Sequence, residues 1–156
     1  MLAKNFMTTN VVTAQEHELA GDVHKKMNTE NLRMLPVLNS DGQVIGILST
    51  FSIMQRIIPD YLNSGDLNQI SYAPDLGILR RKFKEVITSP IREMIDTSPL
   101  FVRKEDSLLS VAAAISSHGK HEYAVIVDDN KKLLGIISAG DILNRLKLKT
   151  SEENNA

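Results

Sequence analysis

A serine and an aspartate three residues apart follow the last apolar run of this chain. They are Ser138 and Asp141 in the run Gly135-Ile136-Ile137-Ser138-Ala139-Gly140-Asp141-Ile142. An ionised carboxylate has two oxygens that accept hydrogen bonds, so Asp141 can take both hydroxyls of a ribose. The Ser138 hydroxyl and the backbone N–H groups that open the next helix can bind phosphate or sugar oxygens. The pair can therefore hold a nucleoside. The alternative is an ordinary helix N-cap, in which Asp141 binds no ligand.

The same pattern occurs earlier in the chain. The run Gly46-Ile47-Leu48-Ser49 returns as Gly135-Ile136-Ile137-Ser138, at a constant separation of 89 residues. An internal repeat of this kind predicts a duplicated architecture. The first copy has Ser52 where the second has Asp141. Because a neutral hydroxyl cannot replace an anion with two oxygens, we expect the first site to be weak, empty or altered in specificity. We expect one competent nucleotide site per chain.

Each copy predicts the order strand, helix, hairpin, helix, from short β-branched runs and from apolar residues at helical spacing. We expect Thr13 with Glu16 to form a capping box at the first helix, and Asp106 to be the N-cap of its counterpart. One unit would leave a sheet face bare, so the two are expected to pack with a pseudo-twofold relation. The predicted fold is α/β, with two βαββα repeats. The expected strands are residues 11–13, 35–38, 44–48, 100–102, 123–127 and 133–137, and the expected closing helices are 52–58 and 141–148.

The repeats divide the chain into four parts. We expect a first repeat at 1–58, an inserted linker at 59–89, a second repeat at 90–149 and a disordered tail at 150–156. The linker contains an amphipathic helix near residues 75–87, which also carries the basic residues Arg80, Arg81, Lys82 and Lys84. Two interpretations of these basic residues stay open: a solvated helix face, or a contact with a phosphate or a partner.

Composition argues against several classes of function. The 156 residues carry a net charge of −1 and 4% aromatic residues, which indicates no nucleic-acid partner. No window approaches ~18 consecutive apolar residues and no signal-peptide pattern is present, so we expect no membrane span and a cytoplasmic protein. Without a cysteine, a Walker loop or a G-x-S-x-G elbow, we expect no enzyme and no catalytic cofactor. The four histidines lack zincin spacing, so we expect no metal site at His17, His24, His118 or His121.

The ordered set of motifs resembles a tandem pair of cystathionine-β-synthase (CBS) domains, also called a Bateman module. Its pieces are the openings Phe6-Met7-Thr8 and Glu93-Met94-Ile95, the run Leu35-Pro36-Val37-Leu38-Asn39-Ser40-Asp41-Gly42, and Gly-Ile-x-Ser after each hairpin. The resemblance depends on the whole set occurring twice, over nearly the entire chain. It implies regulatory binding of an adenosine-containing ligand, such as AMP, ADP, ATP or S-adenosylmethionine. In that family the ligand lies in the cleft between the paired units.

The resemblance also implies roles for particular residues. The family site is marked by Ser/Thr-x-x-Asp at a strand–helix junction, which Ser138 and Asp141 match, with Asp141 as the ribose ligand. The Tyr123 ring can pack on the base, or it can be a partly buried strand aromatic. The further wall positions that match the family pattern are Glu122, Tyr123, Ile136, Asn10 and Leu32.

The sequence also leads to expectations about the oligomeric state and about the protein that this chain regulates. Apolar helix faces predict a homodimer, and the regulated effector is expected to be a separate enzyme, channel or transcription factor. The expected function is sensing, in which an adenosine ligand shifts the arrangement of the two units. The alternative from another class is a ligand-free assembly module, whose helices serve only dimerisation.

Overall fold

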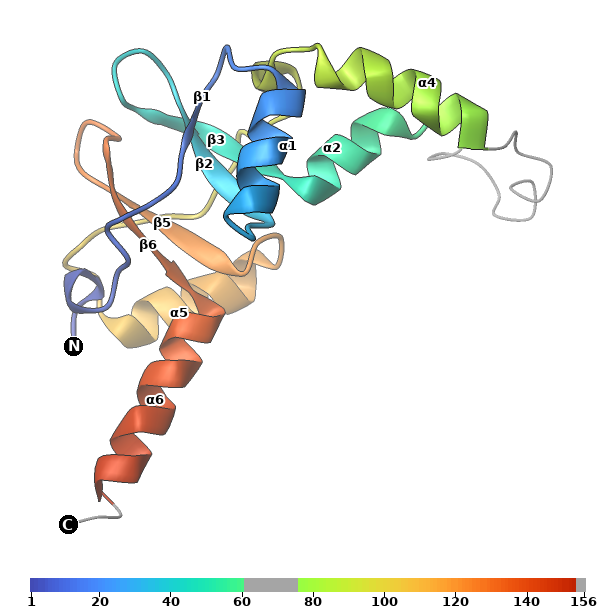
Figure 1. The fold of residues 1–156 in the computed structure, drawn as a ribbon. Coiled ribbons are helices and arrows are strands. Elements are labelled where there is room, and N and C mark those ends of the chain that lie inside the picture. Colours follow the sequence, from blue (N-terminus) through green and yellow to red (C-terminus); the bar gives the residue numbers. More distant parts are fainter. Residues whose placement is uncertain (61–75, 154–156) are drawn as a thin grey trace. The chain divides into compact units, whose positions relative to one another are not determined.

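The structure is a computed structural model that describes residues 1–60 and 76–153, with side chains at 1–60 and 77–147. Figure 1 shows helices and two three-stranded sheets, ordered β1-β2-β3 and β4-β5-β6. This confirms the predicted α/β class with two βαββα repeats. Residues 61–75 of the predicted linker and 154–156 of the predicted tail lie outside the described residues.

The elements follow the predicted order in both repeats. The first repeat contains β1 (Ala14–Gln15), α1 (Ala20–Thr29), β2 (Met34–Leu38), β3 (Val44–Ser49) and α2 (Thr50–Ile57). The second contains β4 (Phe101–Val102), α5 (Leu108–His118), β5 (Tyr123–Val127), β6 (Leu133–Ser138) and α6 (Ala139–Glu153). Between them lies α4 (Leu76–Ile87), the amphipathic helix expected in the linker. A short 3-10 turn opens each repeat, at Ala3–Asn5 and Ile91–Glu93.

The start of the first helix differs from the prediction. The capping box of Thr13 and Glu16 is wrong, because α1 begins at Ala20 and its N-cap residue, Leu19, makes no side-chain cap bond. Residues 14–15 form β1 instead, which pairs in parallel with β2. In the turn before α1 the Gln15 N–H donates to the Glu18 carboxylate at 2.6 Å. This local bond holds the chain in a turn where the Thr13–Glu16 pattern had predicted the first turn of a helix.

Two boundaries in the second repeat also differ. The N-cap of α5 is Ser107, whose hydroxyl accepts from the Ser110 N–H at 3.1 Å. Asp106, the expected cap, accepts from the Arg103 N–H at 2.8 Å. Helix α6 extends to Glu153, so residues 150–153, assigned to a disordered tail from their polarity, are helical.

The chain forms two compact units that are not continuous in sequence. The Asp141 unit consists of residues 1–12, 39–44 and 98–156, and the Ser52 unit consists of residues 13–38 and 45–97. The second repeat is therefore completed by a crossing segment at residues 1–12, which precedes the first repeat, and the first repeat is completed by a crossing segment at residues 88–97, which follows α4. The compact units differ from linear repeats because residues 1–12 bond to β6 and residues 88–97 bond to β3.

Each crossing segment pairs with the last strand of its unit. In the Asp141 unit, Thr8 and Ile136 exchange two backbone hydrogen bonds of 2.9 and 3.0 Å. In the Ser52 unit, Ile47 and Asp96 exchange two of 2.9 Å. The two bridges are equivalent, since each involves the residue after the repeated glycine.

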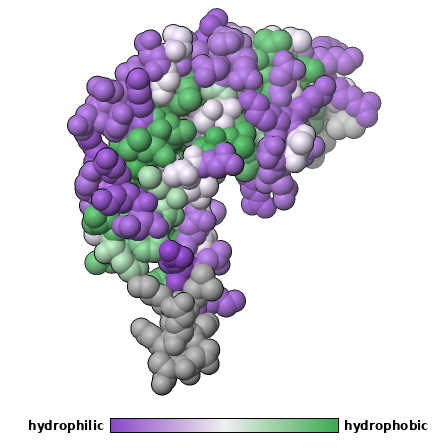
Figure 2. All heavy atoms as spheres, turned by 60° about the vertical axis from the view of Figure 1, so that its left-hand side comes forward, coloured by the Kyte–Doolittle hydropathy of each residue, from purple (hydrophilic) through white to green (hydrophobic). Residues whose placement is uncertain are grey.

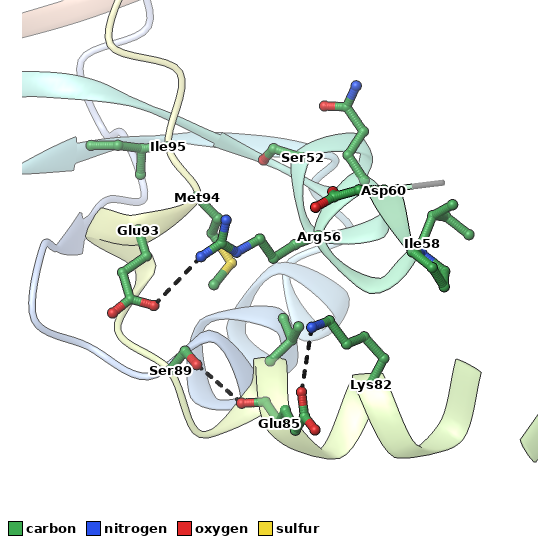
Figure 3. Close-up of a pocket in the computed structure, with 13 residues that line it drawn as sticks. Ser52, Arg56, Ile58, Asp60, Lys82, Glu85, Ser89, Glu93, Met94 and Ile95 are labelled. Carbon is green, nitrogen blue, oxygen red and sulfur yellow. Dashed lines mark hydrogen bonds and ion pairs between the residues drawn. The ribbon is translucent and has the colours of Figure 1, made fainter. Parts of the chain in front are cut away.

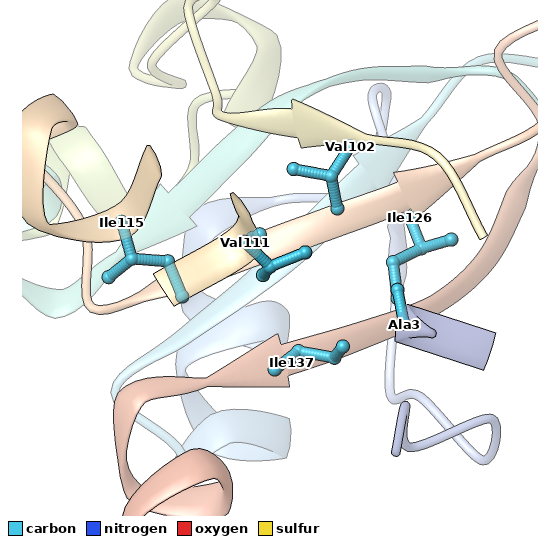
Figure 4. Close-up of a cluster of buried hydrophobic side chains, with 7 residues drawn as sticks. Ala3, Val102, Val111, Ile115, Ile126 and Ile137 are labelled. Atoms are coloured by element: carbon cyan, nitrogen blue, oxygen red, sulfur yellow. The ribbon is translucent and has the colours of Figure 1, made fainter. Parts of the chain in front are cut away.

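The core of the Asp141 unit joins the crossing segment to the sheet and to α5. Figure 4 shows Val111 and Ile115 of α5 facing the strands, with Ala3 of the first 3-10 turn beside Ile126. Burial of apolar surface stabilises by roughly 25 cal/mol per Å². The cluster consists of Ala3, Val102, Val111, Ile115, Ala124, Ile126 and Ile137. The N-terminal turn is thus part of the core that supports β6, the strand that ends at Ser138.

Candidate ligand site

The predicted site residues Ser138 and Asp141 form a reciprocal capping box where β6 meets α6. The Asp141 N–H donates to the Ser138 hydroxyl at 3.0 Å, and the Ser138 N–H donates to Asp141 Oδ2 at 3.0 Å. Asp141 is half-buried, and its Oδ1 accepts no hydrogen bond within the described residues. The N-cap alternative is therefore realised, but it occupies only one of the two carboxylate oxygens.

A pocket of about 270 Å³ opens beside this carboxylate. One wall comes from the start of α6. The other comes from the crossing segment, which is bonded to β6 through the backbone of Thr8. The lining residues are Asn5, Phe6, Met7, Asp141, Asn144 and Arg145. The pocket thus offers a carboxylate, a guanidinium and two side-chain amides, which suit a ligand with hydroxyl groups and an anionic group.

Arg145 is held over an aromatic ring. Its guanidinium carbon lies 4.9 Å from the centroid of the Phe6 ring, within the range of a cation–π contact. Arg145 stands one helical turn after Asp141, so the two side chains lie on the same face of α6. The ring therefore holds a cation near the carboxylate that is predicted to bind the ribose.

Three further predicted residues lie in the same unit. Ile136 is half-buried in β6, where it pairs with Thr8. Asn10 is exposed and follows Thr8 by two residues on the crossing segment. Glu122 has an exposed side chain, and its carbonyl accepts from the Ala139 N–H at 2.7 Å at the junction itself. None of the three lines the pocket described above.

Tyr123 and Leu32 lie elsewhere. Tyr123 is opposite Ser138 in the β5–β6 ladder, but its side chain is only 5% exposed, which agrees with the alternative of a buried strand aromatic. Its hydroxyl is buried and has no hydrogen-bond partner in the described structure. Burial raises the pKa of the Tyr123 hydroxyl above its ordinary value. Leu32 belongs to the Ser52 unit, where it is half-buried.

The junction in the first repeat has the same geometry with a serine in place of the aspartate. The Ser52 N–H donates to the Ser49 hydroxyl at 3.0 Å, and the Ser49 N–H donates to the Ser52 hydroxyl at 3.0 Å. This capping box starts α2 as the other starts α6. The absence of a carboxylate at Ser52 therefore costs the helix none of its cap.

A second pocket, of about 520 Å³, lies beside this junction. Figure 3 shows Arg56 of α2 extending toward Glu93 of the crossing segment, with Lys82 and Glu85 on α4 opposite them. Six of its lining residues occupy positions equivalent to the six that line the Asp141 pocket: Ser52, Gln55, Arg56, Glu93, Met94 and Ile95. The remaining lining residues are Ile58, Pro59, Asp60, Lys82, Glu85, Val86 and Ser89.

Sequence reasoning missed the residues that share the pockets with Asp141 and Ser52. Arg145 and Arg56 are separated by the repeat distance of 89 residues, so the repeat contained the signal for them. Asn5 and Glu93 are related by 88 residues, because the crossing segments are offset by one residue from the rest of the repeat. Their place in the pockets follows from the crossing of the chain, for which the sequence carries no local signal.

No cluster of three or more histidine, cysteine or acidic residues in the described part of the chain could hold a metal ion. The rings of His118 and His121 stack with their centroids 6.0 Å apart. Among residues 1–60 and 76–153, no helix has the length and apolar character needed to cross a membrane.

A family model and a relative of similar length both match this chain over most of its residues. The model of the CBS domain family matches residues 3–59 and 91–148. An uncharacterized protein of Methanocaldococcus jannaschii is 28% identical over 158 residues, which cover 94% of this chain and 91% of the relative.

Two solved structures share the fold. The CBS domain pair of protein MJ0100, in complex with 5′-methylthioadenosine and S-adenosyl-L-methionine, has a TM-score of 0.68 at 18% identity, covering 96% of this chain and 98% of that one. CBSX2 in complex with AMP has a TM-score of 0.70 at 18% identity, covering 95% of this chain and 98% of that one. At these identities the likeness shows the fold alone.

Proposed function

Because this chain belongs to the CBS domain family and carries two copies of the domain, we propose that it is a regulatory module that binds an adenosine-containing ligand and acts on a separate partner. The candidate ligands are AMP, ADP, ATP and S-adenosylmethionine. The observation that carries the proposal is the Asp141 carboxylate, which caps α6 with one oxygen and has the other available beside a pocket. Adenosine ligands bound to two proteins of the same fold support it.

The proposed roles follow from the chemistry of each side chain. Asp141 accepts from the ribose hydroxyls, and the Ser138 hydroxyl supports the junction that presents it. Arg145, the cation over Phe6, binds an anionic group of the ligand. We propose contacts of Asn10 and Ile136 with the base on the family pattern alone, since neither residue lines this pocket. We assign no catalytic step to these residues and propose a cytoplasmic setting.

Regulation requires that the ligand bind two conformations with different affinities. A ligand that binds both equally shifts nothing, and coupling energies of ~1–3 kcal/mol are typical. We propose that binding at Asp141 favours one conformation of the module and that a separate effector responds to it.

The test is a thermal-shift screen of the full chain with AMP, ATP and S-adenosylmethionine. A ligand present at about 100 times its Kd should stabilise the protein by about 2.7 kcal/mol. Asp141→Ser should abolish the shift while leaving the unliganded protein folded, because Ser52 shows that a serine completes this capping box. An Asp141→Ala variant would be less informative, since loss of a cap alone costs about 0.5–2 kcal/mol.

The matched control is Asp41→Ser, which removes an exposed carboxylate from a hairpin turn. It should leave the ligand-induced shift unchanged. An unaltered shift in Asp141→Ser would remove the basis of the proposal.

A second candidate function is a ligand-free assembly module. Apolar side chains remain exposed at equivalent places on α2 and α6: Met54 is 50% exposed and Leu143, its counterpart 89 residues later, is 66% exposed. Hydrophobic residues are also visible among hydrophilic ones on the face drawn in Figure 2. No thermal shift with any adenosine ligand, together with intact dimerisation, would favour this candidate.

A further inference from the structure

An apolar groove of about 380 Å³ lies between α2 and α4 in the Ser52 unit. Figure 1 shows the two helices side by side, and they are in contact. The residues that line the groove are Met54, Ile57, Ile58, Leu79, Arg80 and Phe83. All of them except Arg80 are apolar, so the groove suits apolar side chains and not a nucleotide.

Helix α4 is supported on another side by α1, which fixes this wall of the groove. Val86 is buried, and a Cβ at Gly21 of α1 would lie 3.0 Å from the Ile87 carbonyl oxygen. Beside the groove, Phe83 of α4 is 39% exposed and Met54 of α2 is 50% exposed. A supported helix thus leaves large apolar side chains uncovered, which is typical of an interaction surface.

The same helix carries positive charge that the described residues do not neutralise. Arg80 lines the groove, and the side chains of Arg80, Arg81 and Lys84 are all exposed. No ion pair joins these three cations to a described carboxylate. The remaining cation of α4, Lys82, is paired with Glu85 on the same helix. The charges favour a contact with a partner over the alternative of a solvated helix face.

Charge and spacing indicate which occupant fits the groove. In a symmetric dimer a second copy would present the same basic helix, and like charges would oppose the contact. An acidic partner has the complementary charge. Leu79 and Phe83 are four residues apart, which is about 6 Å along the helix axis, and this spacing matches apolar side chains at i and i+4 of another helix.

We propose that the groove between α2 and α4 binds an acidic amphipathic helix of the effector protein. Apolar side chains one turn apart on that helix enter the groove beside Phe83, and its carboxylates pair with Arg80 and the neighbouring cations of α4. This inference rests on the proposed function, because it identifies the surface through which the module acts on a separate partner.

The test selects binders to the full chain from a phage-display library of randomised helical peptides. We expect the selected peptides to be acidic and to carry apolar residues at i and i+4. In fluorescence anisotropy, Phe83→Ser and Arg80→Glu should each weaken the best peptide about 10-fold or more. Since the Arg80 side chain is exposed, Arg80→Glu tests the charge without disturbing the core.

The matched controls are Leu109→Ser on α5 and Lys25→Glu on α1, which change exposed side chains of the same kinds that do not line the groove. Neither should alter the affinity. Selected peptides that are basic or neutral, or that bind both groove variants as tightly as the wild type, would overturn the inference.

Two other occupants of the groove are distinguishable outcomes, and either would also overturn the inference. If Phe83→Ser or Arg80→Glu converts a dimer to monomer in sedimentation velocity, the groove binds a second copy. If the full chain cosediments with phosphatidylserine vesicles and Arg80→Glu abolishes this, the groove binds a membrane surface.

The thermal shift with adenosine ligands is measured on the same variants. Neither Phe83 nor Arg80 lines the Asp141 pocket, so both variants should retain the shift. If the wild type shows the shift but yields no acidic peptide, the inference fails while the proposed function stands. If it binds acidic peptides at the groove but no adenosine ligand, the proposed ligand fails while the docking surface stands.

Discussion

Asp141 performs a structural task that a serine performs equally well in the other repeat. Ser138 and Asp141 exchange the same two 3.0 Å hydrogen bonds as Ser49 and Ser52. The negative charge of Asp141 is therefore not required for capping α6, although an acidic group is favourable near a helix N-terminus. We assign the Asp141 carboxylate to a ligand because the fold does not need its charge and because it lies beside a pocket.

The Tyr123 hydroxyl is a buried polar group that has no hydrogen-bond partner in the described structure. We expect Tyr123→Phe to leave the free energy of unfolding unchanged at pH 7 or to raise it by up to about 1 kcal/mol, because the buried hydroxyl has no partner in the described structure. Burial raises the pKa of Tyr123 in the folded state, so above pH ~10 the unfolded chain loses this proton first. The wild type should then lose stability with rising pH relative to Tyr123→Phe.

Urea unfolding of both proteins at pH 7 and at pH ~10.5 measures this difference. The two proteins differ only at Tyr123, so the other titrating groups cancel. A loss of more than about 1 kcal/mol in Tyr123→Phe at pH 7 would show that the hydroxyl is bonded, and would contradict the prediction.

At the scale of elements, the repeated glycines allow the crossing segments to dock. A Cβ at Gly135 would lie 2.7 Å from the Thr8 carbonyl oxygen, and a Cβ at Gly46 would lie 2.5 Å from the Asp96 carbonyl oxygen. Both distances are too short for any side chain, so each strand can approach the neighbouring backbone only at a glycine. The Gly-Ile-x-Ser pattern thus reflects packing in its first residue and helix capping in its last.

We expect Gly135→Ala to destabilise the protein by about 1–3 kcal/mol, because the added methyl group displaces the Thr8 backbone. The matched control is Gly140→Ala in the first turn of α6, where the nearest atom would be the Ser138 hydroxyl at 3.6 Å. Alanine there should be neutral or stabilising, since it favours the helix. Chemical unfolding measures both, and equal stabilities for the two variants would contradict the steric argument.

At the scale of the whole molecule, each compact unit contains segments from distant parts of the chain. The Asp141 pocket combines Asn5, Phe6 and Met7 with residues of α6, so it exists only when the N-terminal turn is in place. Ala3 of that turn is fully buried in the core of the unit. Folding of the second repeat therefore depends on residues at the opposite end of the chain.

The predicted homodimer is testable at this scale. Leu143→Asp places a charge on the exposed apolar side of α6 and should shift the protein toward monomer in sedimentation velocity, if this face mediates assembly. Leu109→Asp is the matched control, because Leu109 is 81% exposed but its counterpart in the first repeat, Ala20, is buried. A dimer that survives Leu143→Asp unchanged would contradict the assignment of this face.

The sequence by itself determined the features that depend on neighbouring residues and on repetition. The separation of 89 residues predicted two βαββα units, and apolar runs located strands such as Tyr123–Val127 correctly. The junction of Ser138 and Asp141 was also predicted, because capping boxes and strand–helix junctions are local patterns.

Only the tertiary structure decided which distant residues share a site. It placed Phe6 under Arg145 and Glu93 beside Arg56, and it buried Tyr123, whose position opposite Ser138 is compatible with either a core or a ligand role. Such contacts depend on where the crossing segments pack, and long-range packing is not encoded in any short window of residues.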